Sequence, residues 1–289
     1  MEWHKQQVYN VDNLKRYSFP IVLAGILLYL GIAQVSFSQA QLSFTNGDFT
    51  GFSTAPPEYG AGLNSAANPD YTGGATLSSW SNTGYNFVFT NGNAGDITIQ
   101  GADGDFELAG PNADGGSVHN GLALPTGYTG NVVALDPVYE TGPLSQVVTG
   151  LTNGQEYAVT FDYAGAEQYN YNTATTENMS VALGAAGLSN ANIVADGQTT
   201  QTLSNAANGF TGWYTQTFDF TADATSETLY FLAGGGPVGD PPFTLLADVT
   251  MTPVPEPATS ASWTIFFGML ILLGNRAWRR HKKRPSTNT

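Results

Sequence analysis

Carboxylates are the side chains with the most chemistry to offer in this sequence. All but three of the 23 Asp and Glu residues lie between Gln41 and Val254, a stretch with His119 as its single histidine and no Cys. Two positioned carboxyl groups can hydrolyse a glycosidic bond, and a larger set of oxygen ligands can bind calcium. With so many acids, some pair lies close by chance, and no G-x-S-x-G motif surrounds a serine. We therefore predict no enzymatic activity and keep a glycoside hydrolase as an alternative.

One acidic run has part of the spacing of a calcium-binding loop. Asp103, Asp105 and Glu107 stand at positions one, three and five, and Asp114 stands at position twelve. Position six is Leu108 rather than the glycine that such a loop needs for its sharp turn, and no helical pattern flanks the run. We predict a solvated acidic loop here.

Aromatic side chains are the second class with binding chemistry. Trp80, Trp213, Tyr169 and Tyr171 could stack on sugar rings, because an aromatic face is broad and apolar while its edge group is polar. Trp213 begins a strand-like pattern and is expected in the core. Tyr169 and Tyr171 lie in a Tyr-Asn-Tyr-Asn run typical of a loop tip, and they are our candidate glycan-stacking residues.

The elements that position these residues are short strands. Alternating or β-branched runs are separated by clusters of Gly, Asn, Asp and Pro, with no helical period, and this pattern indicates an all-β, jelly-roll-like β-sandwich over residues 41–252. Asn153-Gly154 predicts a turn between neighbouring strands. The clearest strand patterns are residues 96–100, 155–163, 213–220 and 228–232.

The basic residues are confined to the two ends of the chain. None of the nine Lys and Arg residues lies between Gln41 and Val254, so this stretch forms no ion pair between Lys or Arg and a carboxylate. Contacts to phosphates need such cations, which excludes a nucleic-acid-binding groove. The uncompensated charge either serves solubility alone or is offset by cations.

The N-terminal 40 residues have the organisation of a signal peptide. Lys15 and Arg16 precede an uncharged, mostly apolar run over residues 19–35, and Ser38 and Ala40 are small residues before a cleavage point at Gln41. We predict export and cleavage by signal peptidase. A retained membrane anchor is the alternative.

The C-terminus has three parts in a fixed order. Pro255-Glu256-Pro257, within the motif 254–258, is followed by an apolar run over about 258–274 that is long enough for one transmembrane helix. A basic tail over 276–284 would stay in the cytoplasm by the positive-inside rule. That tail contains Arg276, Arg279, Arg280, Lys282, Lys283 and Arg284.

Residues 253–284 resemble the PEP-CTERM protein-sorting signal in all three parts. The resemblance implies a Gram-negative bacterium and recognition by exosortase, a membrane cysteine protease-transpeptidase. It also implies transient membrane anchoring, removal of the tail and delivery to the cell surface or the extracellular matrix. In that role Pro255, Glu256 and Pro257 are a substrate of another enzyme.

A second resemblance covers the acidic domain. Asn46-Gly47-Asp48-Phe49 looks like the opening strand of galactose-binding-like jelly rolls, and residues 145–163 look like a strand pair of that family. The arrangement is similar to carbohydrate-binding modules and choice-of-anchor domains. The resemblance implies that the first and last strands lie close, so that Asp48 and Asp248 could share a structural calcium ion. Surface or turn-capping aspartates are the alternative for this pair.

Together these patterns predict an exported surface or extracellular-matrix protein with a structural or adhesive role, without catalysis and without a required cofactor. A carbohydrate-binding module for exopolysaccharide is the alternative function. In either case the partners are signal peptidase, the exosortase-type protease, the membrane before processing and, in the second case, exopolysaccharide.

Overall fold

The computed structural model describes residues 41–56, 60–65, 74–90, 97–98, 105–113 and 120–255. The predicted signal peptide, Glu256, Pro257, the apolar run and the basic tail lie outside these ranges. His119, Asp103 and Asp114 lie outside them as well. Within the described residues, no helix has the length and apolarity needed to cross a membrane.

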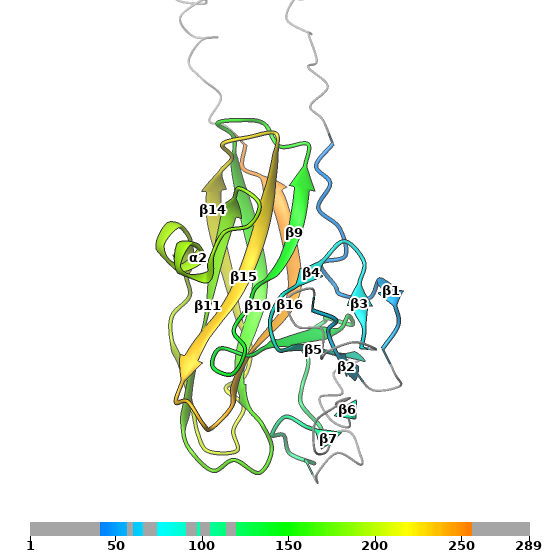
Figure 1. The fold of residues 1–289 in the computed structure, drawn as a ribbon, viewed down its shortest axis with the longest axis vertical. Helices are drawn as coiled ribbons and strands as arrows, with labels where there is room; N and C mark the ends of the chain where they lie inside the picture. Colours follow the sequence, from blue (N-terminus) through cyan, green and yellow to red (C-terminus); the bar gives the residue numbers. More distant parts are fainter. Residues whose placement is uncertain are drawn as a thin grey trace, which may run out of the picture. The chain divides into compact units, whose positions relative to one another are not determined.

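Two six-stranded sheets, which we name sheet I and sheet II, dominate the domain, and their neighbouring strands are antiparallel (Figure 1). Sheet I has the order β14 (Tyr214–Thr221), β10 (Glu156–Glu167), β16 (Pro242–Pro253), β8 (Val132–Leu135), β5 (Asn86–Phe89) and β2 (Gly60–Gly62). Sheet II has the order β12 (Gln198–Thr199), β11 (Thr175–Gly184), β15 (Ser226–Gly236), β9 (Leu144–Thr149) and β4 (Ser81–Asn82), and β13 (Leu203–Asn205) also pairs with β11.

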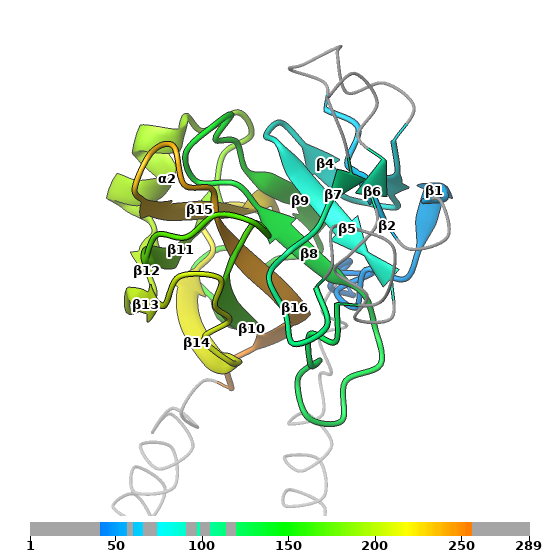
Figure 2. The ribbon, with the colours of Figure 1, turned by 90° about the horizontal axis from the view of Figure 1, so that it is seen from below.

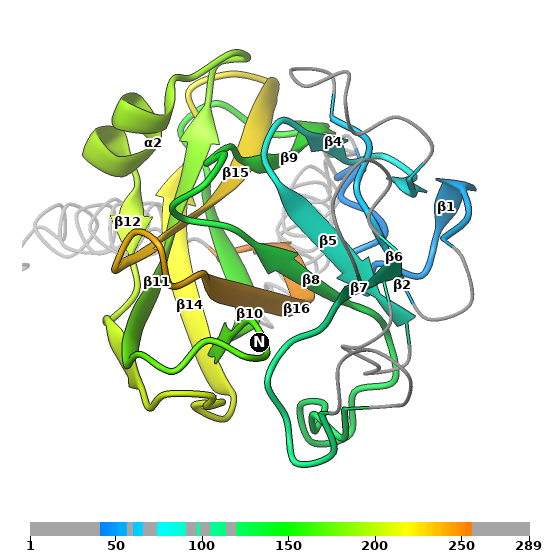
Figure 3. The same cartoon turned by 60° about the horizontal axis from the view of Figure 1, so that its bottom comes forward.

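Smaller elements complete the described chain. Two short ribbons pair β1 (Phe52–Thr54) with β3 (Thr76–Leu77) and β6 (Ile97–Thr98) with β7 (Asp105–Phe106). The helix α2 (Asn190–Asp196) lies on the outer side of β11 and β15 (Figure 3). Ile193 is the buried residue of this helix, and it packs against Tyr230 and Leu232 of β15.

The connections make this a sandwich rather than a set of hairpins. From β8 to β16 every connection passes from one sheet to the other, except those among β11, β12 and β13. Figure 2 shows the two sheets as facing layers. The predicted all-β sandwich is confirmed, and the patterns over 155–163, 213–220 and 228–232 form β10, β14 and β15.

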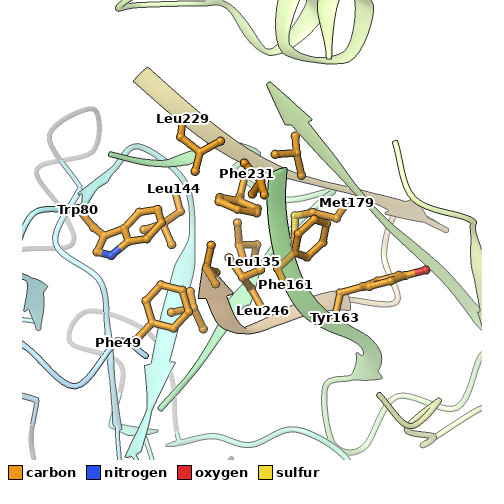
Figure 4. Packing of buried hydrophobic residues seen from close by; sticks show 14 of the residues in the cluster. Phe49, Trp80, Leu135, Leu144, Phe161, Tyr163, Met179, Leu229, Phe231 and Leu246 are labelled. Carbon is orange, nitrogen blue, oxygen red and sulfur yellow. The ribbon is translucent and has the colours of Figure 1, made fainter. Parts of the chain in front are cut away.

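The main core lies between the sheets and follows the period-two alternation of the strands. In β10, Tyr157, Val159, Phe161 and Tyr163 are buried on the inner face. The Phe161 ring lies 5.3 Å from that of Phe231 in β15, centroid to centroid (Figure 4). Because alternate residues of a strand point to opposite faces, this alternation fixes which residues can reach the core.

A second apolar cluster covers part of the outer face of sheet I. Phe87 and Phe89 of β5 and Phe243 and Leu245 of β16 point away from sheet II and are buried. The connection between β5 and β8 supplies their cover, with Leu108 and Leu122 among the buried residues. This part of sheet I is therefore packed on both faces.

One local expectation is wrong, and a second holds in a different setting. Residues 46–49 form a turn instead of an opening strand, because Asn46 and Phe49 have positive φ angles of 54° and 56°. The Asn46 side chain holds this turn by accepting a hydrogen bond from the Gly51 amide (2.7 Å) and donating one to the Gly51 carbonyl (2.9 Å). Asn153-Gly154 does form a turn, with a φ of 83° at Gly154, but it joins β9 and β10, which belong to different sheets.

Candidate functional site

Two tyrosines from separate connections meet ring to ring, and a third from another connection acts electrostatically on one of them. Tyr85 lies between β4 and β5, Tyr139 between β8 and β9, and Tyr171 between β10 and β11. The rings of Tyr85 and Tyr139 meet edge to face, with centroids 5.3 Å apart and planes at 71°. Tyr171 is the smallest of the causes that raise the pKa of Tyr85, after burial and the charges of Asp136, Tyr139 and Glu140. We call Tyr85, Tyr139 and Tyr171 the tyrosine cluster.

The cluster offers aromatic surface to solvent on a fixed base. Tyr139 is 69% exposed, whereas Tyr85 and Tyr171 are half-buried. Tyr85 packs edge to face on Phe87, with centroids 4.6 Å apart, and Phe87 belongs to the second apolar cluster. The exposed ring therefore stands on a stack of aromatic side chains that leads into the interior.

A buried carboxylate shapes the turn that carries Tyr139. Asp136 is 1% exposed, and its Oδ1 accepts hydrogen bonds from the backbone amides of Val138 (2.7 Å) and Tyr139 (2.9 Å). Burial raises the pKa of Asp136, while these two amides lower it. The Asp136 side chain therefore stabilises the turn in which it lies, because its two hydrogen bonds from backbone amides favour the charged carboxylate.

Buried asparagines tie this turn to the one that carries Tyr85. The Asn86 side chain accepts a hydrogen bond from the Asp136 amide (3.1 Å) and donates to the Gly142 carbonyl (3.1 Å). The Tyr85 amide donates to the Glu140 carbonyl (2.9 Å). Gly84 packs directly on Gly142, where an added Cβ would lie 2.6 Å from the opposing backbone. The close approach of two glycines brings the two tyrosines together.

The carboxylates that act on Tyr85 are those of Asp136 and Glu140. Burial raises the pKa of Tyr85, and the negative charge of Asp136 and Glu140 raises it further. Glu140 is half-buried beside the exposed Tyr139. No Lys or Arg occurs in the whole stretch from Gln41 to Val254, so neither residue type offsets these acids from within that stretch.

The loop that carries Tyr171 is tied down at both ends. Residues 107–109 run beside its start, where the Tyr169 amide donates to the Glu107 carbonyl (2.8 Å). Asn170 has a positive φ of 71°, and the Thr173 amide donates to Oε1 of Glu167 (3.3 Å). Of the two predicted stacking residues, Tyr171 joins the cluster, while Tyr169 is half-buried against the neighbouring segment.

Two fully buried glutamates lie at the base of the loop that carries Tyr171. Glu167 and Glu177 continue the inward-facing positions of β10 and β11 and are both 0% exposed. Glu167 also accepts a hydrogen bond from the Asn208 amide, and Glu177 accepts one from the Thr175 hydroxyl. Oε2 of Glu177 has no hydrogen-bond partner and lies against Gly165, where any Cβ would collide with it.

Burial raises the pKa of Glu177 to about 7, and the nearby charge of Glu167 raises it as well. The hydrogen bond from Thr175 works in the opposite direction. A carboxyl group that cannot reach water and has no cation to pair with is most stable in its neutral form. Because this group is wholly enclosed, it cannot touch a polymer bound at the surface.

The second predicted site, Asp48 with Asp248, forms a shallow hollow of about 320 Å³. The structure brings the two carboxylates together, and the pKa of Asp248 is raised by burial and then by the charges of Asp162 and Asp48. Asp48 accepts hydrogen bonds from the amide and hydroxyl of Thr50 (3.3 and 2.9 Å), so it also caps its own turn. Asp248 sits at a bulge of β16 with a φ of 48°.

This hollow meets the needs of calcium only in part. Calcium takes six to eight oxygen ligands. The hollow offers the two carboxylates, the hydroxyls of Thr50, Thr126 and Thr129, and backbone carbonyls. Among the residues that the structure describes, no group of three or more Asp, Glu or His side chains is arranged to hold a metal ion. A shared calcium stays a prediction.

The two tryptophans considered from sequence lie elsewhere. Trp80 is buried in the main core, where its Nε1 donates to the Asn46 carbonyl (2.9 Å). Trp213 is half-buried and donates to the Ala123 carbonyl (2.6 Å). Sequence analysis missed Tyr85 and Tyr139, although the Asp136-Pro137 pair before Tyr139 is a turn signature that could have drawn attention to it.

Comparisons with known proteins identify no family for this chain. No family model matches the sequence, and no curated protein matches it. The fold is similar to solved β-domains at low identity. One is an adhesin domain of Lys-gingipain from Porphyromonas gingivalis, at 14% identity over 61% of this chain and 92% of that domain, with a TM-score of 0.36.

Two further similar structures are carbohydrate-binding domains. The N-terminal cellulose-binding domain of β-1,4-glucanase C from Cellulomonas fimi is 18% identical over 71% of this chain and all of that domain, with a TM-score of 0.26. A family 35 carbohydrate-binding module from an environmental isolate is 13% identical over 55% of this chain and 96% of the module, with a TM-score of 0.25. At these TM-scores the similarity carries no argument about function.

Proposed function

We propose that residues 41–254 form a non-catalytic glycan-binding domain of an exported, surface-displayed protein. The observation that carries the proposal is the tyrosine cluster, in which Tyr139 is 69% exposed and rests on Tyr85. An exposed, rigidly held tyrosine provides a broad apolar face with a hydroxyl at the edge, which suits a sugar ring that has C–H groups on its face and hydroxyls around it.

The positions of the chain ends support display of the cluster. Gln41 lies beside Gly150 at the end of β9, and the Val254 amide donates to the Glu156 carbonyl at the start of β10 (2.8 Å). Tyr171 follows the other end of β10, twelve residues along the strand, or about 35 Å at the usual rise per residue. A domain held through its C-terminus would therefore present the tyrosine cluster away from the attachment point.

The sorting role of the C-terminus belongs to the same proposal. β16 ends at Pro253, directly before the motif Pro255-Glu256-Pro257. The motif thus follows the folded domain without a long linker, at the end remote from the tyrosine cluster. Processing by an exosortase-type protease at this point would release the domain intact to the cell surface or the matrix.

Three buried acids near the tyrosine cluster are poorly placed for catalysis. Glu177, whose pKa is raised to about 7, would be the natural general acid, but it is fully enclosed. Glu167 is enclosed as well, and Asp136 is occupied by two backbone amides. General acid–base catalysis requires a carboxyl group within hydrogen-bond reach of the substrate, which none of these three offers.

The test is a binding assay on the full chain in detergent against a panel of soluble neutral, amino-sugar and uronate oligosaccharides. We expect at least one class to bind, and Tyr139→Ala to weaken that binding at least tenfold. Tyr214→Ala is the matched control, since Tyr214 is 41% exposed on β14 and lies outside the cluster. If no class of oligosaccharide binds, the glycan-binding proposal fails. The structural or adhesive role then remains, without a glycan ligand.

A further inference from the structure

Two glutamates are enclosed together where β10 ends and β11 begins. Glu167 is the last residue of β10 and Glu177 is the third residue of β11, and both are 0% exposed. Oε2 of Glu177 lies against Gly165, which stands two residues before Glu167 on the same face of β10. The stretch from Gln41 to Val254 has no Lys or Arg, so neither residue type offsets the charge of this pair from within that stretch.

The Glu167 carboxylate ties two loops to the end of β10. Its Oε1 accepts a hydrogen bond from the amide of Thr173 (3.3 Å), and its Oε2 accepts one from the amide of Asn208. Thr173 lies in the β10–β11 loop, residues 168–174, and Asn208 lies in the segment 206–209 that follows β13. Because Thr173 and Asn208 are exposed while the carboxylate is not, these loops lie between Glu167 and solvent.

One oxygen of the Glu177 carboxyl group receives no hydrogen bond. Oε1 accepts one from the Thr175 hydroxyl, whereas Oε2 is buried without a hydrogen-bond partner. Leu203 of β13 and Gly235 of β15 stand opposite Glu177 in sheet II, and neither has a side chain that titrates or donates a hydrogen bond. A neutral carboxyl group fits this site, because an ionised one would lie near the charge of Glu167 without water.

We propose that Glu167 and Glu177 form a pH-sensitive latch: the loop 168–174 and the segment 206–209 are closed while Glu177 is neutral and open locally when Glu177 is ionised. Opening these two segments admits water to both carboxylates and so relieves the repulsion between them. β10 and β11 stay in place, because their inward-facing apolar side chains belong to the main core.

The pKa of Glu177 agrees with this latch. Burial raises it to about 7, and the charge of Glu167 raises it as well, while the hydrogen bond from Thr175 lowers it. Two further acids lie near the pair. Asp240 acts on Glu167 from the β15–β16 connection, and Glu107, 2% exposed, lies in the segment that pairs with the end of β10. Both can carry only negative charge, so neither opposes opening as the pH rises.

The test is amide hydrogen exchange of the full chain in detergent, read by mass spectrometry at about pH 6 and about pH 8.5. Dividing by the intrinsic exchange rates gives protection factors free of the direct effect of pH. We expect the protection of residues 168–174 and 206–209 to fall about tenfold between these pH values, since in the opened form the pKa of Glu177 returns to its ordinary 4.5.

A repeat in a low, non-denaturing concentration of urea identifies the kind of opening. Protection that is lost through local opening barely depends on urea, because little surface becomes exposed. The protection of β15, which runs through the core, should depend steeply on urea. The two loop segments should therefore differ from β15 in urea dependence.

Two buried glutamates allow a matched comparison. Glu177→Gln keeps the shape and removes the ionisation, so the loop segments should keep at about pH 8.5 the protection that they have at about pH 6. Glu227 of β15 is 7% exposed and also has one oxygen without a hydrogen-bond partner, but its other oxygen accepts from the Asp223 amide (3.3 Å) before β15. Glu227→Gln should leave the pH effect on the loops unchanged.

The latch is overturned if loop protection does not change with pH, or changes equally in Glu177→Gln. Loop protection with the same urea dependence as β15 would also overturn it, because the loops would then open only on unfolding. If Glu177→Gln does not fold, the unchanged protein decides: a pH-dependent, urea-independent loss confined to the two segments supports the latch, and its absence overturns it. No readout requires a glycan, so the result is independent of the proposed function.

Discussion

The ring of Tyr139 rests edge-on against the ring of Tyr85, with centroids 5.3 Å apart, although the two residues are 54 positions apart in the chain. Tyr85 in turn packs on Phe87, so the three rings form a column from the surface to the interior. Because Tyr139 is the exposed end of this column, it is free to contact a ligand, whereas Tyr85 supports it from beneath. The division of roles leads to the first prediction.

Tyr139→Ala and Tyr85→Ala should have different effects on stability. Tyr139 is largely exposed, so its truncation should change the free energy of unfolding by less than about 0.5 kcal/mol. Tyr85 is half-buried against Phe87, and its loss should cost roughly 2 kcal/mol. Both variants should lose glycan binding. Urea denaturation gives the stabilities, and an equal loss in the two variants would contradict the supporting role of Tyr85.

A second prediction separates the turn from the ligand contact. Asp136→Ala removes the acceptor for the amides of Val138 and Tyr139 and should destabilise the domain by about 1–3 kcal/mol. Binding should also weaken, since the turn that presents Tyr139 loses its anchor. The measurement is titration with the oligosaccharide class that binds the unchanged protein, together with urea denaturation. Unchanged affinity in a destabilised Asp136→Ala protein would show that the turn does not position Tyr139.

Sequence patterns predicted the strands well because alternation is a local property. Tyr157, Val159, Phe161 and Tyr163 alternate without interruption, and the burial of β10 follows them. The same alternation, continued past the last aromatic residue, reaches Gly165 and Glu167 on the inner face. An acid at an inward position of a strand was thus a readable signal of a buried carboxyl group, and we missed it by ending the pattern at residue 163.

The binding surface was less accessible to sequence reasoning, because it depends on which connections meet. Tyr171 could be named from its loop-tip pattern, but its neighbours Tyr85 and Tyr139 come from two other connections. They meet where Gly84 packs on Gly142, a contact between backbones that has no local signature. The proximity of Asp48 to Asp248 was anticipated only through the family resemblance, and spacing alone gives no reason for it.

The hollow between Asp48 and Asp248 supports a prediction about salt and calcium. In a domain without Lys or Arg, NaCl should screen the mutual repulsion of the acids and raise the melting temperature of the full chain by several degrees. At constant ionic strength, a calcium ion shared by the two aspartates should add roughly 5–10 °C at one hundred times its Kd. Asp248→Asn should lose the calcium increment and keep the NaCl effect.

The predicted effect of calcium on the melting temperature and the predicted effect of NaCl can each fail without the other. A calcium increment that persists in Asp248→Asn would place the ion elsewhere. Equal effects of calcium and magnesium would indicate general screening by divalent cations, because magnesium demands a tighter, octahedral arrangement that this open hollow does not provide. A melting temperature that does not move with NaCl would contradict the account of the acidic surface as self-repelling.

The last prediction concerns pH and Glu177. Its pKa is raised from an ordinary 4.5 to about 7 by burial and by the charge of Glu167. Between these two values the folded protein keeps a proton that the unfolded chain has released. The free energy of unfolding from this group is therefore highest below about pH 4.5 and falls, by roughly 3 kcal/mol in all, as the pH rises through 7.

Urea denaturation of the full chain at pH 5 and pH 8 measures this difference. Glu177→Gln replaces the acid by a neutral group of the same shape, so the variant should be more stable than the unchanged protein at pH 8 and should lose much of the pH dependence. The raised pKa values of Glu167 and Glu227 act in the same direction and should leave a smaller slope. Glu156→Gln, at an exposed position, should leave the slope unchanged. If Glu177→Gln is instead destabilised at pH 8, the charged carboxylate does not cost the folded protein stability, which contradicts the account of the raised pKa.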